Sequence, residues 1–399
     1  MRNKPRPLVA AAAATTIVAA AGCASAPHSS TSLSSSAGMP AICARTGPDV
    51  FAVSGRQNSP APVLTSTMQA AAFKAIGSGA AIGLVDVDGA PHMVAAAAFS
   101  DPTAGNSYAL NQDKANFLGQ IASAVSAIRA AHPHVNVLEA LDVAARAIRG
   151  ACADGGTVYI ADSGLQDVGP VNFQQPGTLE ASPADVVAFL TREHELPDLK
   201  GIAVVLIGFG DTAAPQPPLS ISQRTNLIAI WSAIARTAGA TSVRVDPAPR
   251  SGAAPAHVPP VSAVPVPAEL SWGPADNSFA FPDSGPVGFE PNTAVFRDPP
   301  AAEAALEGLA NYMTANPSVK IQLTGTTAHW GTLESDITLS MERSNAVKAV
   351  LVQLGVSPSQ INISGVGWEF PGYQDDQGPD GTLLPGPAEH NRSVIVTKL

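Results

Sequence analysis

Hydrophobic residues in the first half of the chain form short continuous runs that alternate with stretches of helical periodicity. Runs of strand length occur at 80–87, 92–99, 156–164, 201–209 and 241–247. Apolar residues recur every three or four positions at 113–130, 136–149, 183–193 and 221–238. Strands that are apolar throughout and alternate with helices are typical of a mainly parallel sheet covered on both faces. We therefore predict a doubly wound α/β domain, in which ligands gather at the carboxyl ends of the strands.

The last third of the chain shows a more compact alternation. Its predicted strands lie at 286–296, 319–325, 361–368 and 392–399, and its predicted helices at 299–317 and 339–354. Pro299 and Pro300 suit the start of the first helix, and Gly355 suits the end of the second. These elements predict a smaller α/β domain, with two helices packed on one mixed sheet.

Two segments of biased composition divide the chain. Residues 23–40 are rich in serine and poor in large apolar side chains, so we expect an unstructured tether. Residues 246–275 are rich in proline, which predicts an extended and semi-rigid linker. The globular parts are therefore expected at 41–245 and 276–399.

The N-terminus has the composition of an export signal. Arg2, Lys4 and Arg6 precede a short apolar run that ends in Ala-Ala-Gly-Cys at Cys23. This pattern predicts a signal peptide over residues 1–22, and the last four residues resemble a bacterial lipobox, in which the cysteine carries the lipid. The alternative is an ordinary cleaved signal peptide. No other apolar run is as long as a membrane-spanning helix.

Charge and cysteine content agree with an exported protein. Without residues 1–22 the chain has 19 basic and 32 acidic residues, a net charge of −13. Such an acidic chain is a poor partner for nucleic acid. With Cys23 assigned to lipid, Cys43 and Cys152 remain, and an even pair in an exported protein predicts a disulfide, with two buried thiols as the alternative.

Arg343 is the one charge in the apolar stripe of the 339–354 helix. It follows Leu339 by four residues and precedes Val347 by four, so it shares their inward face. An uncompensated buried guanidinium costs several kcal/mol, on the order of the penalties for any buried charge. Arg343 therefore needs either a ligand or an internal partner.

Four motifs, in order along the chain, indicate which ligand Arg343 could bind. They read GTTAHWG at 325–331, LSMERSNAV at 339–347, GVGWEFP at 365–371 and NRSV at 391–394. The segment that carries them resembles the OmpA-like domains of cell-wall-associated lipoproteins and motor stator proteins. In that family the domain binds the diaminopimelate of the peptidoglycan stem peptide, with an aspartate on the ammonium and the helix arginine on the carboxylate.

The resemblance implies a peptidoglycan site with one group missing. The predicted site residues are Thr327, Trp330, Asp336, Arg343, Asn391 and Arg392. Ala328 stands where the family has its aspartate, and Asp336 stands where the family usually has asparagine. Losing one partner of a desolvated charge pair costs about 2–5 kcal/mol. Asp336, seven residues before Arg343, either restores a carboxylate to the pocket or forms an internal salt bridge with Arg343. Trp330 either stacks on the ligand or, as is commoner for tryptophan near a sheet edge, packs against the fold. Trp368 is expected in the core.

The first domain resembles, more distantly, von Willebrand factor A-type α/β domains. The metal-binding loop of that family corresponds to Asp86–Ala90 here, and both of its serines are absent. Solvated turn acids are therefore the better interpretation of Asp86, Asp88 and Asp211, and neither a metal nor another cofactor is predicted. A metal-dependent adhesin or enzyme that uses these three acids is the alternative.

These features together predict a non-catalytic protein of the cell envelope. Lipid at Cys23 would anchor it on the outer side of the cytoplasmic membrane, or in the periplasm or outer membrane, and the OmpA-like domain would hold peptidoglycan. Two such attachments reinforce each other through effective concentration. The alternative is a scaffold for other envelope proteins whose OmpA-like pocket no longer binds the wall.

Overall fold

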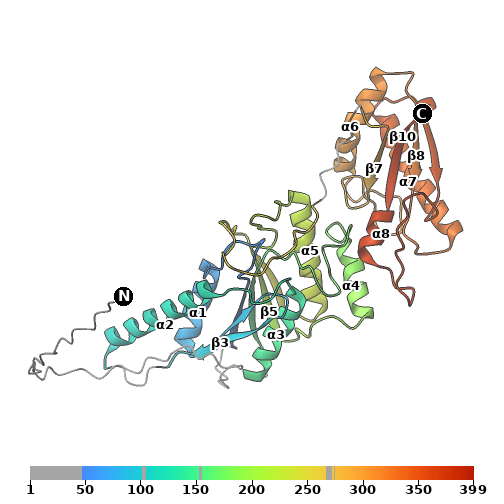
Figure 1. Cartoon of the computed structure of the whole chain (residues 1–399). Helices are drawn as coiled ribbons and strands as arrows, with labels where there is room; N and C mark the ends of the chain where they lie inside the picture. Colours follow the sequence, from blue (N-terminus) through green and yellow to red (C-terminus); the bar gives the residue numbers. More distant parts are fainter. Residues whose placement is uncertain (1–46, 101–104, 152–154, 267–271, 274) are drawn as a thin grey trace, which may run out of the picture.

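The computed structural model describes residues 47–100, 105–151, 155–266, 272–273 and 275–399. They form two α/β domains that lie end to end (Figure 1). Cys23, Cys43 and Cys152 lie outside the described residues, so the lipid and the disulfide stay predictions. Among the helices described, none is both long and apolar enough to cross a membrane.

The first domain contains a mainly parallel sheet, as predicted, and the sheet has six strands. Its strands are β1 (Asp49–Val53), β2 (Ala81–Asp86), β3 (His92–Ala98), β4 (Gly156–Ala161), β5 (Ile202–Ile207) and β6 (Ser242–Asp246). They lie in the order β3-β2-β1-β4-β5-β6. Only β3 runs antiparallel to its neighbour. The strand order reverses between β1 and β4, which is where such sheets usually bind ligands.

Helices cover both faces of this sheet. They are α1 (Ser66–Ser78), α2 (Ser107–Ala127), α3 (Val137–Ala151), α4 (Pro183–Arg192) and α5 (Ile221–Thr237). One core contains α3, α4 and α5 and includes Leu141, Leu190 and Trp231. The other contains α1 and α2 and includes Met68 and Ile121. Burial of the strands on both faces explains their continuous apolar runs.

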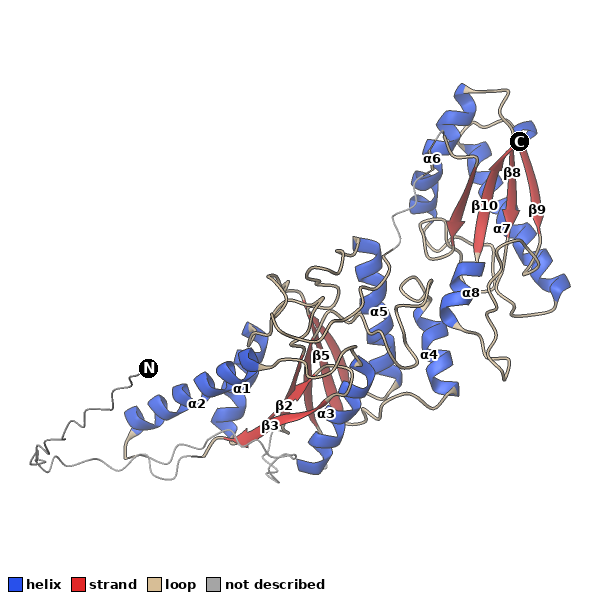
Figure 2. Cartoon of the chain, viewed as in Figure 1, coloured by secondary structure: helices blue, strands red, loops and turns tan. Residues whose placement is uncertain are grey.

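The second domain is a four-stranded mixed sheet with helices on one side (Figure 2). Its elements are β7 (Ser278–Pro282), α6 (Pro299–Ala315), β8 (Ile321–Gly325), α7 (Leu333–Gln353), β9 (Ile361–Gly365), α8 (Pro385–Asn391) and β10 (Ser393–Lys398). The strand order is β7-β10-β8-β9, with only β8 and β9 parallel. Leu309 of α6 and Leu351 of α7 share the core with the sheet.

Two predicted elements of the second domain need correction. The strand predicted at 286–296 is a loop with a single bridge between Phe289 and Phe296, and the edge strand is β7. Pro286 and Pro291 cannot donate to a ladder, which explains the loop. The helix predicted at 339–354 begins at Leu333, because Thr332 caps it by accepting from Ser335 N at 3.2 Å.

Much of the proline-rich segment is packed and does not behave as an extended spacer. Its backbone passes over the carboxyl ends of the first sheet, where Asn58 Nδ2 donates to the carbonyl of Val261 at 3.0 Å. Gln216 bonds both backbone groups of Val264, accepting at 2.7 Å and donating at 3.1 Å. The segment therefore belongs to the first domain as far as Val264.

Candidate functional site

Arg343 lies on the inward face of α7, as its sequence position predicts. The residue is only 4% exposed. Its Nε donates to the carbonyl of Thr293 at 3.0 Å, and its guanidinium carbon lies 5.1 Å from the ring centroid of Phe289. Burial lowers the pKa of Arg343, and the nearby Asp283 acts in the opposite direction. The loop before α6 thus covers a buried cation.

No carboxylate within the described ranges forms an ion pair with Arg343. Asp283 is the acid with the largest electrostatic effect on the pKa of Arg343, and it already has other partners. Asp283 pairs with Arg297 at 3.4 Å and accepts from Phe289 N at 3.0 Å. A buried guanidinium with no paired anion is electrostatically unfavourable, so this arrangement is suited to receive an anion.

A small hollow adjoins Arg343. All its empty space, with the part open to solvent, amounts to about 150 Å³, and it is lined by Phe281, Asp283, Val287, Phe289, Arg343, Ser393 and Val394. As it stands, it holds no space for a water molecule. A carboxylate therefore reaches Arg343 only when the covering loop, residues 288–297, moves outward.

Arg392 lies at the start of β10, beside the same hollow. Its guanidinium forms an ion pair with Asp185 of α4, in the first domain. Below it, Glu389 of α8 accepts from Ser284 N at 2.6 Å. Burial, with a smaller contribution from Asp283, raises the pKa of Glu389 to about 8. Glu389 is therefore largely protonated at neutral pH and adds little negative charge beside Arg343 and Arg392.

The position of the family aspartate is filled by apolar packing. Ala328 is 2% exposed and contacts Leu383 and Ala388 in a small hydrophobic cluster. Beside it, the Oγ1 of Thr327 is buried and has no hydrogen-bond partner among the described residues. The position at which the family has its aspartate is thus closed by apolar packing, whereas Arg343 has a buried guanidinium that no carboxylate of the described residues pairs with.

Asp336 does not pair with Arg343 in the described residues, which rules out the alternative of an internal salt bridge between them. Its Oδ2 accepts from Gly331 N at 3.2 Å, in the first turn of α7. Burial raises its pKa. A carboxylate at this position interacts favourably with the helix dipole, which explains its place without reference to Arg343.

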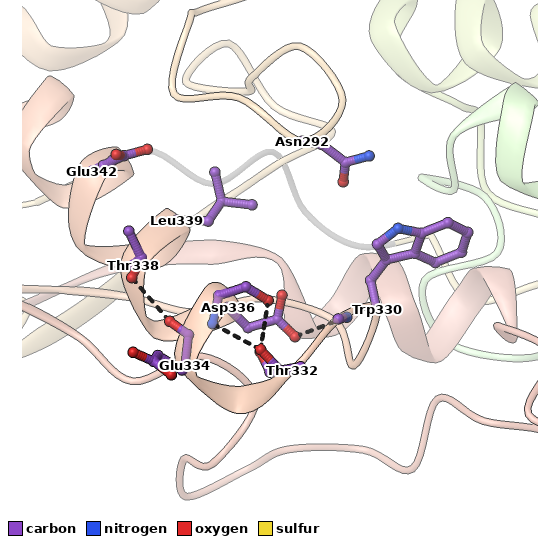
Figure 3. Close-up of a pocket in the computed structure, with 10 residues that line it drawn as sticks. Asn292, Trp330, Thr332, Glu334, Asp336, Thr338, Leu339 and Glu342 are labelled. Atoms are coloured by element: carbon purple, nitrogen blue, oxygen red, sulfur yellow. Dashed lines mark hydrogen bonds between the residues drawn. The ribbon is translucent and has the colours of Figure 1, made fainter.

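A second, wider hollow lies at the beginning of α7 (Figure 3). It measures about 550 Å³ and is lined by Asn292, Trp330, Gly331, Thr332, Glu334, Ser335, Asp336, Thr338, Leu339 and Glu342. Trp330 stands at its edge and is 63% exposed, so the prediction that it packs against the fold is wrong. Trp368, expected in the core, is half-buried and stacks on His329 with ring centroids 4.1 Å apart.

Asn391 is buried, and its side-chain amide forms hydrogen bonds within the fold. Its Nδ2 donates to the carbonyl of Gln374 at 2.7 Å and to Asp376 Oδ2 at 2.9 Å, and its Oδ1 accepts from Gln374 N at 2.9 Å. All its amide groups are therefore used to fix the 374–376 loop. Of the six predicted residues, Trp330 and Asp336 line the wider hollow, Arg343 lines the smaller one, and Thr327, Asn391 and Arg392 line neither.

The acids of the first domain do not converge on a metal position. Asp88 accepts from the backbone of Ala131 and His132, and Asp211 accepts from Arg250 N and pairs with Arg224. Within the described part of the chain, no group of three or more potential ligands is arranged to hold a metal ion. The loop at Asp86–Ala90 follows β2 and not the first strand, which corrects its assignment to the metal-binding loop.

A buried ion pair at the ends of β1 and β4 was not predicted. Arg56 Nη2 lies 3.0 Å from Asp162 Oδ1, with both side chains almost fully enclosed, and also donates to Ser163 Oγ at 2.9 Å. The pair occupies the point at which the strand order reverses. The signal that could have indicated it is the short strand Asp49–Val53, whose carboxyl end leads directly to Arg56.

Comparison with solved structures finds similarity to the second domain. The peptidoglycan-associated lipoprotein from Burkholderia pseudomallei is 24% identical over 31% of this chain and 92% of that one, with a TM-score of 0.24. The periplasmic domain of Helicobacter pylori MotB is 20% identical over 30% of this chain and 74% of that one, with a TM-score of 0.25. Such values indicate nothing about function by themselves. The OmpA family model matches residues 288–381, which contain Arg343 and the three motifs from GTTAHWG to GVGWEFP. The C-terminal domain of this chain is therefore an OmpA family domain.

Proposed function

We propose that this chain attaches to peptidoglycan through its OmpA-like domain, without catalysis, as a component of the cell envelope. The supporting observation is Arg343, a buried guanidinium that no carboxylate of the described residues pairs with. The planar fork of arginine matches a carboxylate, and a diaminopimelate-type stem peptide carries several. Arg343 is therefore the proposed anchor, with Arg392 beside it.

The proposed binding mode differs from that of a site that binds both the ammonium and the carboxylate of an amino acid. Ala328 offers no charge to an ammonium group, so affinity would come from the carboxylate and from contacts around it. The loop at 288–297 must open to admit the ligand, and Trp330 is exposed where a sugar or peptide could stack. We expect weaker binding than in a domain that retains the acid.

A second candidate function is a scaffold for envelope proteins. The apolar packing of Ala328 with Leu383 and Ala388 supports it, because this packing removes the ammonium position altogether. In this case Arg343 would stabilise only the loop that covers it.

Sedimentation with purified peptidoglycan tests the proposal. Residues 24–399 would be compared with Arg343→Ala, and with Arg146→Ala as a matched control, because Arg146 lies exposed on α3. We expect Arg343→Ala to lower retention by about tenfold or more, as for the loss of a desolvated charge partner. Equal retention of the two arginine variants would remove Arg343 from the site. Background retention of all three proteins would favour the scaffold.

The membrane attachment is a separate part of the proposal. A lipid on Cys23 followed by the serine-rich tether would hold the domain near the wall, and each attachment would raise the effective concentration of the other. Mass spectrometry of the mature N-terminus in a bacterial host tests this point, with Cys23→Ala as the control. An unmodified Cys23 in the wild-type chain would overturn the lipid anchor.

A further inference from the structure

Helix α4 of the first domain contacts α8 of the second (Figure 2). Besides the pair of Asp185 with Arg392, Arg192 Nη1 donates to Thr382 Oγ1 at 3.0 Å. The two backbones also approach closely, because a Cβ built on Gly177 would lie 2.2 Å from the carbonyl oxygen of Gly386. Charge, a hydrogen bond and glycine packing thus all contribute to one interface.

Asp185 is the acid that pairs with Arg392. The two acids of the OmpA-like domain near Arg392 have other partners, since Asp283 pairs with Arg297 and Glu389 accepts from Ser284 N. Without the first domain, Arg392 would keep its charge beside Arg343 and lose its ion-pair partner. A ligand carboxylate between the two arginines would meet two cations.

We infer that α4 is a docking surface for the OmpA-like domain of the same chain, and that Asp185 competes at Arg392 with the carboxylates of peptidoglycan. This inference rests on the proposed function. In the docked state Asp185 takes the place of the external carboxylate at Arg392. In the undocked state both arginines are available, so wall binding and domain docking oppose each other.

Two variants separate the domains by independent means. Asp185→Asn removes the charge from α4, and Asp142→Asn is its control, because Asp142 pairs with Arg146 on the exposed face of α3. Gly386→Ala adds a Cβ that would lie 2.8 Å from both the Pro176 carbonyl and Thr178 Oγ1. Its control is Gly308→Ala in α6, where a Cβ meets no atom within 4 Å.

The experiment measures docking and wall binding on residues 24–399. Small-angle X-ray scattering reports the separation of the domains, and sedimentation reports retention by purified peptidoglycan. We expect Asp185→Asn and Gly386→Ala to increase the radius of gyration and to raise retention about threefold to tenfold, the range for loss of a part-buried competing charge. Both controls should match the wild type.

The outcomes distinguish this inference from the proposed function. Retention that depends on Arg343 but does not rise in either undocked variant would overturn the competition and leave wall binding intact. An unchanged radius of gyration in both variants, with retention also unchanged, would overturn the docking surface. Clear undocking without retention of any variant would overturn the proposed function, and the competition with it.

Discussion

The Nε of Arg343 and the carbonyl oxygen of Thr293 are joined by a hydrogen bond of 3.0 Å, although the residues are fifty positions apart. Thr293 belongs to the loop that covers the hollow, and Arg343 belongs to the helix below it. This bond is therefore broken when the loop opens, and a ligand carboxylate can offer the guanidinium a stronger, charge-assisted replacement.

Arg343→Met should abolish wall binding without destabilising the protein. Met fills much of the same volume against Phe289, while the cost of burying an unpaired charge disappears. Replacement of buried charges by apolar residues is often neutral or stabilising, by about 1–4 kcal/mol. Urea unfolding and sedimentation on one preparation would measure both effects. A loss of more than about 2 kcal/mol in stability would reveal an anionic internal partner for Arg343, in addition to the carbonyl of Thr293 to which it donates.

Ala328→Asp should destabilise the OmpA-like domain and fail to strengthen binding. The new carboxylate would be enclosed with Leu383 and Ala388, where no cation of the described residues pairs with it. We expect a loss of about 2–4 kcal/mol in the free energy of unfolding. Ala304→Asp, on the exposed face of α6, is the control and should change stability by less than about 0.5 kcal/mol. A gain in peptidoglycan retention would show that the apolar cluster opens readily.

Stability of the OmpA-like domain should fall as the pH rises. The folded Glu389 carboxyl has a pKa of about 8, against an ordinary value of 4.5, so between these values the folded state holds a proton that the unfolded state has released. The stabilisation of the folded state that comes from the raised pKa of Glu389 is therefore complete below the ordinary pKa. It is lost as the pH passes through about 8.

Glu389→Gln should flatten this pH dependence, because an amide resembles the protonated carboxyl and does not titrate. Hydrogen exchange of β8 and β10 at mildly acidic and mildly alkaline pH would follow the second domain alone. Glu334→Gln, an exposed change at the start of α7, should leave the slope unchanged. If the stability of the Glu389→Gln variant still fell as the pH rises, another group would be responsible for the pH dependence.

Trp231→Phe should destabilise the first domain by about 2–4 kcal/mol. The indole Nε1 of Trp231 donates to the carbonyl of Gly164 at 2.8 Å, and its ring contacts Phe209 edge-on at 6.0 Å. Phenylalanine would leave that carbonyl unpaired and a cavity beside it. Trp330→Phe is the matched control, since an exposed indole should tolerate the change to within about 0.5 kcal/mol in urea unfolding.

The apolar pattern predicted the elements whose own periodicity is strong. The runs 156–164 and 201–209 contain the buried strands β4 and β5, and the run at 299–317 contains the whole of α6. The pattern missed β1, which has only five residues, and α1, whose alanines give no clear apolar stripe. It misassigned 286–296, where Phe289 and Val295 suggested a strand that Pro286 and Pro291 forbid.

The candidate site was predictable only where one helix determines it. Arg343 was found because its spacing from Leu339 and Val347 fixes the face on which it lies. The pairing of Arg392 with Asp185 depends on the packing of two domains across 207 positions, and no local pattern contains that information. The same holds for Ala328, whose neighbours Leu383 and Ala388 come from a segment that local periodicity did not assign to any element.

The packed part of the proline-rich segment determines how tension would pass through the molecule. Val264, fixed by Gln216, is the last residue shown to be held by the first domain before the chain continues to the second. A pull on a wall-bound C-terminal domain therefore reaches the first sheet at Val264, and not at the end of β6. The bonds at Val264 and then at Val261 bear the load in sequence, so this segment would peel away and lengthen the molecule before either sheet is strained.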